Sequence, residues 1–199
     1  MIKLYLFDVD GVLLDGRPLD GKPWKSTLKD DLGIDPSELK RLFFKPHWQS
    51  IVTGKKKIIP YLDDALHKME TPTTATGLLD YWFSNDGRQV SACVALLEGL
   101  HDAGKKVGLA TNQEFRRADW IKKAFMGKFS EFYSSSEIGH AKPDLKFFQA
   151  ILDSEGCDPS EVAFVDDSLE NCNAAAEIGM QIHHFQTPDA LARWLADLS

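Results

Sequence analysis

The sequence lacks the features that mark secreted, disulfide-bonded or membrane-spanning proteins. Its three cysteines, Cys93, Cys157 and Cys172, are far apart, and neither a CxxC pair nor a cysteine–histidine zinc spacing occurs. We therefore expect free thiols in a reducing compartment. No apolar run approaches the roughly 20 residues that a membrane-spanning helix needs. The opening residues, MIKLYLFDVD, turn acidic too early for a signal peptide. These absences predict a cytoplasmic protein.

An excess of basic residues is also missing. The net charge is −7 over 199 residues, with acidic and basic side chains mixed throughout. Proteins that bind nucleic acid usually carry a basic excess, so we expect neither a nucleic-acid nor a membrane partner. The chain is 43% hydrophobic and 27% charged, which is ordinary for a globular protein. We expect a monomer or a weak homodimer with one main core and a small second domain.

Strand-like and helix-like segments alternate from about residue 86 to the end of the chain. Short apolar runs at 106–110 and 161–165, and the run MQIHHF, are separated by amphipathic segments. The chain also opens with an apolar run, LYLF. Continuous apolar strands that alternate with helices are typical of a parallel sheet covered on both faces. The sequence therefore predicts an α/β fold, a Rossmann-like doubly wound parallel sheet.

Residues 16–85 interrupt this alternation. GRPLDGKPW has the composition of a loop, whereas IDPSELKRLFF, IIPYLDDALHKM and TGLLDYWF have helical patterns. We therefore predict a catalytic core from residues 1–15 and 86–199, with a small helical cap domain inserted at 16–85. Arg17 and Trp24 could face the active site from the hinge of the cap. The cap aromatics Trp48, Tyr81, Trp82 and Phe83 could line a pocket for a leaving group, although such residues more often form a core.

Polar side chains follow three of the predicted strands, and a lysine lies in a loop between two of them. In open parallel sheets, ligands bind outside the carboxyl ends of the strands. We therefore expect these polar residues to meet at one edge of the sheet, together with the glycine that follows the first pair. They are Asp8, Asp10, Gly11, Thr111, Asn112, Lys142, Asp166 and Asp167.

Four carboxylates at one edge repel one another unless cations lie among them. Lys142 supplies one positive charge. Mg²⁺ is the natural second, because it prefers oxygen ligands and often joins carboxylates to a phosphate. Of Asp8 and Asp10, one could attack phosphorus and the other could protonate the leaving oxygen and then activate water. The lysine, Thr111, Asn112 and the amides near Gly11 could bind phosphate oxygens.

The segments DVDGVLLD, LATN, AKPD and FVDDS, in that order, resemble the four motifs of the haloacid dehalogenase-like hydrolase superfamily. The resemblance covers nearly the whole chain. It implies a Rossmann-like core with a helical cap, and Mg²⁺-dependent phosphate transfer through an aspartyl phosphate. The true dehalogenases of the superfamily lack an aspartate at the position of Asp10, so its presence favours phosphate chemistry.

The resemblance also implies a role for each matching residue. Asp8 would be the nucleophile and a metal ligand. Asp10 would be the general acid and base and would bind metal through its backbone carbonyl. Thr111 and Lys142 would bind the phosphate, with help from Asn112. Asp167 would coordinate the metal directly, and Asp166 would act either through a water molecule or by orienting the lysine. Asn171 would lie in the outer shell of the metal.

The sequence thus predicts a Mg²⁺-dependent phosphatase for a small phosphorylated metabolite, a sugar phosphate or a similar phosphomonoester. Two alternatives stay open. A phosphomutase would return the phosphoryl group to its substrate, although the mutases of this superfamily have larger caps. A non-catalytic protein that binds a phospho-ligand or a protein partner would share the fold, but here every catalytic position is intact.

Overall fold

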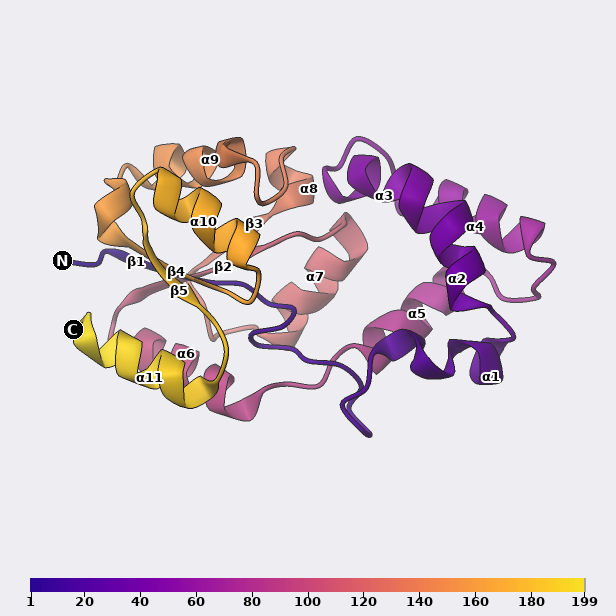
Figure 1. Cartoon of the computed structure of the whole chain (residues 1–199), viewed down its shortest axis with the longest axis horizontal. Coiled ribbons are helices and arrows are strands. Elements are labelled where there is room, and N and C mark those ends of the chain that lie inside the picture. The colour runs from indigo at the N-terminus through magenta and orange to yellow at the C-terminus, as the bar shows by residue number, and fades with distance from the viewer. Residues whose placement is uncertain (199) are drawn as a thin grey trace.

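The computed structural model describes residues 1–198. Its centre is a sheet of five parallel strands in the order β3-β2-β1-β4-β5, shown on the left of Figure 1. This arrangement confirms the predicted Rossmann-like fold. The strands are β1 (Leu4–Phe7), β2 (Lys106–Thr111), β3 (Glu131–Ser134), β4 (Val162–Asp166) and β5 (Gln181–His184).

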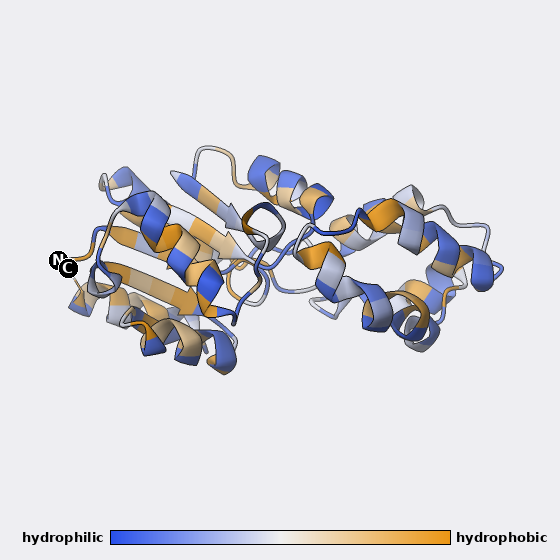
Figure 2. Ribbon diagram, turned by 90° about the horizontal axis from the view of Figure 1, so that it is seen from above, coloured by the Kyte–Doolittle hydropathy of each residue, from blue (hydrophilic) through white to orange (hydrophobic). Residues whose placement is uncertain are grey.

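The central strand β1 is buried on both faces because alternate side chains enter different cores. Tyr5 and Phe7 pack in one hydrophobic cluster, and Leu4 and Leu6 pack in another on the opposite face. All four side chains are at most 2% exposed. In Figure 2 the strands are largely hydrophobic, whereas the helices around them carry hydrophilic residues outside. Burial on both faces explains why LYLF is a continuous apolar run.

Helices cover both faces of the sheet. The cluster around Tyr5 and Phe7 includes residues of α6 (Ser91–Asp102), α7 (Phe115–Ala124) and α11 (Pro188–Asp197). The opposite cluster includes residues of α9 (Leu145–Glu155) and α10 (Leu169–Glu177). Short elements α8 (Ser135–Ile138) and η3 (Pro159–Glu161) complete this part. No helix among residues 1–198 is long and apolar enough to cross a bilayer.

A second group of helices forms the right-hand part of Figure 1. These helices pack around a hydrophobic cluster of their own, which includes Phe43, Leu62 and Leu79. They are η1 (Trp24–Thr27), α1 (Leu28–Leu32), α2 (Pro36–Leu39), η2 (Lys40–Phe44), α3 (Lys45–Val52), α4 (Ile58–Lys68) and α5 (Ala75–Asn85). We refer to residues 24–85 as the helical segment.

The chain enters and leaves the helical segment through two stretches that hydrogen-bond to each other. The amide of Val90 donates to the carbonyl of Leu13 over 2.9 Å, and the amide of Asp15 donates to the carbonyl of Arg88 over 2.9 Å. The Arg88 guanidinium also binds the Asp15 carboxylate at 2.9 Å. This paired connection places the start of the helical segment beside Asp10 and Gly11.

Side chains cap the starts of three helices. The carboxylates of Asp35 and Asp144 and the hydroxyl of Thr187 accept from backbone amides at the starts of α2, α9 and α11. No sequence pattern indicated a helix at Lys45–Val52, because Pro46 suggests a break there. The helical backbone nevertheless continues without interruption from α2 through the π-helical turn η2 into α3.

Candidate active site

The three central strands bring the predicted residues to one edge. Phe7, the last residue of β1, lies beside Leu109 of β2 and Val165 of β4. Asp8 therefore lies level with Asp166, the last residue of β4, and one residue before the level of Thr111, the last residue of β2. Asp8 is 7% exposed, Thr111 1% and Asp166 0%. Polar side chains this deeply buried need charged or hydrogen-bonding partners.

Lys142 is the charged partner of both Asp8 and Asp166. Its Nζ lies 2.6 Å from Asp166 Oδ2 and 3.1 Å from Asp8 Oδ1. It also donates to the carbonyl oxygen of Ala110 over 2.7 Å. The residue is only 5% exposed, so the ammonium group is held as a buried cation between two strands. Its charge balances part of the negative charge at this edge.

The loop that carries Lys142 is fixed by Asn112. The backbone amide of Lys142 donates to Asn112 Oδ1 over 2.8 Å, and Asn112 Nδ2 donates to the carbonyl of Lys142 over 2.8 Å. Both polar atoms of this side chain are therefore used to position the lysine. The predicted contact between Asn112 and a phosphate stays a prediction.

The two aspartates after β4 have different surroundings. Asp166 accepts from the Ser168 amide over 2.8 Å and from Asn171 Nδ2 over 3.0 and 3.1 Å, in addition to its pair with Lys142. It is thus a fixed, fully buried acceptor that orients the lysine. Asp167 is exposed. A Cβ added to Gly11 would lie 2.4 Å from Asp167 Oδ2, and Gly11 has a φ of +84°. Glycine is therefore required where the first loop meets Asp167.

Three carboxylates could hold a divalent cation together. Asp8, Asp166 and Asp167 each offer one oxygen, and these oxygens lie within 4.8 Å of one another. Oxygen-only ligands suit Mg²⁺. Burial raises the pKa of Asp8 to about 8, with Asp166 and Asp10 adding to the rise and Lys142 opposing it. Burial and Asp166 raise the pKa of Asp167 as well. These carboxylates therefore resist full ionisation without a further cation, which fits a metal site.

Asp10 is turned toward a different set of groups. Gln113 Nε2 donates to Asp10 Oδ2 over 2.7 Å and to Thr111 Oγ1 over 3.1 Å. Arg117 NH2 lies 3.4 Å from Asp10 Oδ1. The Asp10 side chain is 47% exposed, so it remains accessible beside the buried ion pair. A carboxylate in this position can exchange protons with a bound molecule.

Sequence reasoning missed Arg117. This side chain is 1% exposed and donates to the carbonyl oxygens of Phe83 and Asp86, at the end of α5. Its guanidinium lies over the Trp120 ring, 4.4 Å from the centroid. One signal was present in the sequence: the residue lies four positions before Ile121, on the apolar face of an amphipathic helix. An arginine there must have buried partners.

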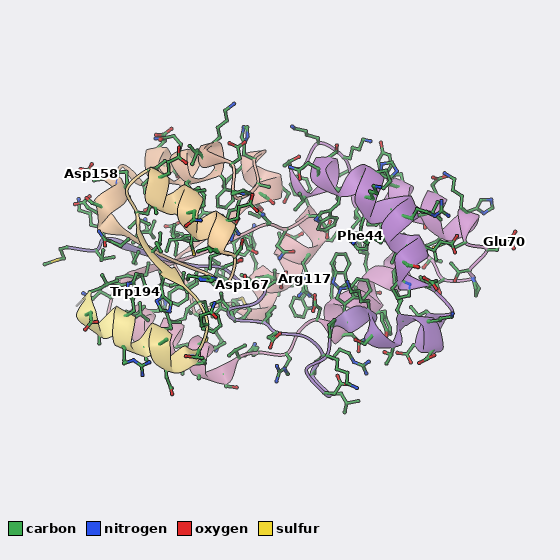
Figure 3. All side chains as sticks on the ribbon, viewed as in Figure 1. Phe44, Glu70, Arg117, Asp158, Asp167 and Trp194 are labelled. Atoms are coloured by element: carbon green, nitrogen blue, oxygen red, sulfur yellow. The ribbon has the colours of Figure 1, made fainter. Side chains whose placement is uncertain are left out.

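Trp24 lies beside the candidate site, whereas the side chains of Arg17 and His140 are bound to other residues. Trp24 lies with Asp10, Gly11 and Asp86 around a cavity of about 280 Å³. Arg17 is buried and donates to Thr27 Oγ1 over 2.6 Å. His140 is half-buried and pairs with Asp144 at 2.8 Å. Figure 3 shows Arg117 and Asp167 between the sheet and the helical segment.

Comparison with known proteins identifies the family. A model of the haloacid dehalogenase-like hydrolases matches residues 2–179. The chain belongs to this family. The resemblance carried by the four motifs is thereby confirmed, and the protein is a hydrolase of the haloacid dehalogenase-like family.

Relatives include proteins named as phosphatases. A sesquiterpene phosphatase of Aspergillus oryzae, astK, is 28% identical over 89% of this chain and 87% of its own length. An N-acetylmuramic acid 6-phosphate phosphatase of Pseudomonas aeruginosa is 23% identical over 99% of this chain and 89% of its own length.

Solved structures show the same fold. A haloacid dehalogenase-family enzyme of Bacteroides thetaiotaomicron, solved as a magnesium complex, has a TM-score of 0.77 and 25% identity, with 93% of each chain covered. The same enzyme was solved with magnesium and inorganic phosphate and matches with a TM-score of 0.73 and 23% identity, over 94% of this chain and 95% of that one.

Proposed function

We propose that this haloacid dehalogenase-like hydrolase is a Mg²⁺-dependent phosphatase for a small phosphomonoester, acting through an aspartyl phosphate on Asp8. The observation that carries the proposal is the buried Asp8–Lys142–Asp166 cluster, in which Lys142 Nζ lies 3.1 and 2.6 Å from the two carboxylates. The half-exposed Asp10 follows Asp8 by two residues. The names of the relatives support assignment to the phosphoric monoester hydrolases.

In the first proposed step, a carboxylate oxygen of Asp8 attacks phosphorus and the bond from phosphorus to the leaving oxygen breaks. Asp10 donates its proton to that oxygen, which leaves as an alcohol. The Lys142 ammonium and the Thr111 hydroxyl are placed to bind the phosphoryl oxygens. Mg²⁺, held by Asp8, Asp166 and Asp167, would supply neutralisation of charge on the carboxylates and the phosphate.

In the second proposed step, water attacks phosphorus of the aspartyl phosphate. Asp10, now a carboxylate, accepts a proton from this water, and the bond from phosphorus to Asp8 breaks. Inorganic phosphate and the original carboxylate result. Gln113 and Arg117 hold the Asp10 carboxylate at 2.7 and 3.4 Å, which positions it for both proton transfers.

We also propose that residues 16–85 act as a cap that shapes the site from above the carboxyl edge. The helical segment has its own hydrophobic cluster, and its two connections lie beside Asp10 and Gly11. Closure of such a cap would exclude water during the first step. A cytoplasmic location and a monomeric or weakly dimeric state stay predictions.

The test is phosphate release from a panel of phosphomonoesters, with and without Mg²⁺, for the wild-type protein and Asp8→Asn. We expect Mg²⁺-dependent release that falls by more than about 1,000-fold in the variant. Asp153→Asn, which changes an exposed carboxylate bound only to Gln149, is the matched control and should retain activity.

Three results would contradict the proposal. One is a folded wild-type protein that releases no phosphate from any ester. A second is full activity of Asp8→Asn. A third is isomerisation of a sugar phosphate with little release of phosphate, which would indicate a mutase.

A further inference from the structure

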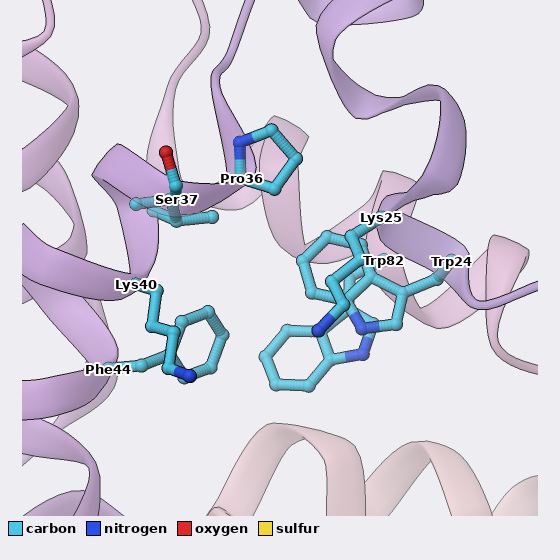
Figure 4. Close-up of a pocket in the computed structure, with 8 residues that line it drawn as sticks. Trp24, Lys25, Pro36, Ser37, Lys40, Phe44 and Trp82 are labelled. Carbon is cyan, nitrogen blue, oxygen red and sulfur yellow. The ribbon is translucent and has the colours of Figure 1, made fainter.

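Three aromatic side chains of the helical segment, Trp24, Phe44 and Trp82, line a second cavity, next to the one lined by Asp10. It encloses about 370 Å³ and is lined by Trp24, Lys25, Pro36, Ser37, Leu39, Lys40, Phe44 and Trp82. Such a volume is in the range of pockets for small molecules, about 300–1,000 Å³. Figure 4 shows the two indole rings on one side of the cavity and Phe44 across from them.

The aromatic walls of this cavity are ordered by contacts with one another. The rings of Trp24 and Trp82 are stacked, with centroids 4.9 Å apart and 19° between their planes. Phe44 meets Trp82 edge-on at 5.7 Å, and Trp48, which does not itself line the cavity, contacts both at 5.4 and 5.8 Å. All four side chains are only half-buried. Half-buried indole and phenyl faces that line a cavity leave apolar surface for a bound molecule to cover.

The aromatic cavity adjoins the candidate active site. Trp24 and Lys25 line both this cavity and the one formed by Asp10, Gly11 and Asp86. In addition, Trp82 Nε1 donates to Asp86 Oδ2 over 3.1 Å. The aromatic cavity therefore lies directly next to the cavity lined by Asp10. A molecule whose phosphate is held at Asp8 would extend its organic part toward it.

The chemistry of the cavity selects against a sugar. A sugar ring carries hydroxyl groups around its rim, and these lose their hydration on burial, so they need polar partners. In this cavity the polar side chains are Ser37 and the exposed Lys25 and Lys40 at the edge. The aliphatic stems of such lysines add apolar surface, while their ammonium groups stay in water. The walls themselves are aromatic and aliphatic.

We propose that this aromatic cavity binds the leaving group of the substrate, and that this group is flat and apolar, either aromatic or polyunsaturated, rather than a sugar. The inference rests on the proposed phosphatase activity and narrows its substrate class. It replaces the sugar phosphate expected from sequence with a hydrophobic primary phosphate.

The first experiment compares three primary alkyl phosphates, 2-naphthylmethyl phosphate, farnesyl monophosphate and glucose 6-phosphate. Their leaving oxygens are alike, so differences in kcat/KM report the contacts of the organic part. We expect one or both hydrophobic esters to exceed glucose 6-phosphate by about 10-fold or more. Equal or faster hydrolysis of glucose 6-phosphate would overturn the inference while leaving the phosphatase activity established.

The second experiment changes the cavity. Trp24→Leu is expected to lower kcat/KM for the preferred hydrophobic ester by about 10- to 100-fold and to change that for glucose 6-phosphate by less than about threefold. The matched control is Trp194→Leu, which removes a half-buried tryptophan stacked on His183 in the sheet part. It should leave unchanged the ratio of kcat/KM for the hydrophobic ester to kcat/KM for glucose 6-phosphate. An equal loss for all esters in Trp24→Leu would overturn the inference.

A binding measurement separates this inference from the proposed catalysis. Binding of 2-naphthylmethyl phosphonate, which cannot be hydrolysed at its P–C bond, is followed by quenching of tryptophan fluorescence. We expect saturable quenching with the wild-type protein and a dissociation constant that is about 10-fold higher for Trp24→Leu. If no phosphomonoester is hydrolysed but this binding is seen, the phosphatase proposal fails and the cavity assignment stands. Absence of binding to both proteins would overturn the assignment.

Discussion

The carboxyl edge of the sheet and the helical segment use opposite kinds of buried side chain. At the sheet edge, Asp8, Lys142 and Asp166 are charged and nearly inaccessible, and each is held by specific partners. The helical segment instead packs aromatic and aliphatic residues, and its cavity is lined by stacked tryptophans. A fixed charged cluster suits bond breaking, which needs exact placement of charge. An apolar cavity suits recognition, because shape and apolar area decide what fits.

Arg117 is one of the side chains that join the two regions. This side chain extends from α7 of the sheet part, touches Asp10, and donates to carbonyl oxygens of Phe83 and Asp86 at the end of α5. This buried guanidinium is therefore one link between the two regions, and the Ser135 hydroxyl, which donates to the carbonyl oxygen of Val52 over 2.6 Å, is another. Four predictions test how independent the regions are.

Replacing Lys142 by methionine should have the largest effect. The change leaves Asp8 and Asp166 buried without their cation, and losing one partner of a buried ion pair costs about 3–5 kcal/mol. We expect phosphate release to be lost and the free energy of unfolding, measured with urea in the absence of Mg²⁺, to fall by that amount. Lys146→Met, at an exposed site on α9, should change neither quantity. Unchanged stability of Lys142→Met would show that the lysine is not the balancing charge.

Replacing Arg117 by methionine should affect catalysis through Asp10. For alkyl phosphates, whose leaving oxygen needs a proton, we expect kcat/KM to fall by about 10- to 100-fold. For p-nitrophenyl phosphate, whose leaving group needs little protonation, the loss should be much smaller. Arg117→Lys should restore part of the activity, and the exposed neighbour in Arg116→Met should matter little. Equal losses for both types of ester would indicate a structural role alone.

Mg²⁺ should stabilise the sheet part more than the helical segment. At 100 times its dissociation constant, a bound ligand adds about 2.7 kcal/mol, which raises the melting temperature by about 5–10 °C for a protein of this size. Hydrogen exchange should slow around β1 and β4 and stay unchanged in α4. Asp167→Asn should reduce the shift, whereas Asp153→Asn should not. A uniform effect on both regions would show that they behave as one unit.

The smallest effect is expected within the helical segment, at Asp31. Hydrogen bonds from Tyr81 and Thr27 lower the pKa of this exposed carboxyl group. The pKa of Asp31 is lower in the folded state than in the unfolded state. The stabilisation is therefore present above the pKa of the unfolded state, about 3.9, and is lost as the pH falls through the pKa of the folded state. Asp31→Asn should therefore destabilise the protein slightly at pH 7 and less at pH 3, as measured by thermal unfolding. A difference in stability between the wild-type protein and Asp31→Asn that grows at low pH would contradict this account.

Much of the sheet and its edge could be predicted because the causes are local. LYLF and VAFV are continuous apolar runs, which predicts strands buried on both faces, and the aspartates that follow them must then lie at the carboxyl edge. The helix starts at Asp35, Asp144 and Thr187 follow from side-chain caps within one turn. Arg117 and Gln113 were missed because their partners are distant in sequence: Asp10 lies 107 and 103 residues away.

The sequence by itself determined the order of strands and helices, the four motifs and the residue types needed for phosphate chemistry. These depend on hydrophobic periodicity and on short spacings along the chain. Only the tertiary structure decided that Asn112 holds the Lys142 loop, that Arg117 joins Asp10 to the end of α5, and that Trp24 stacks on Trp82 beside the site. Each of these depends on packing between distant segments, and no local pattern in a sequence specifies such a contact.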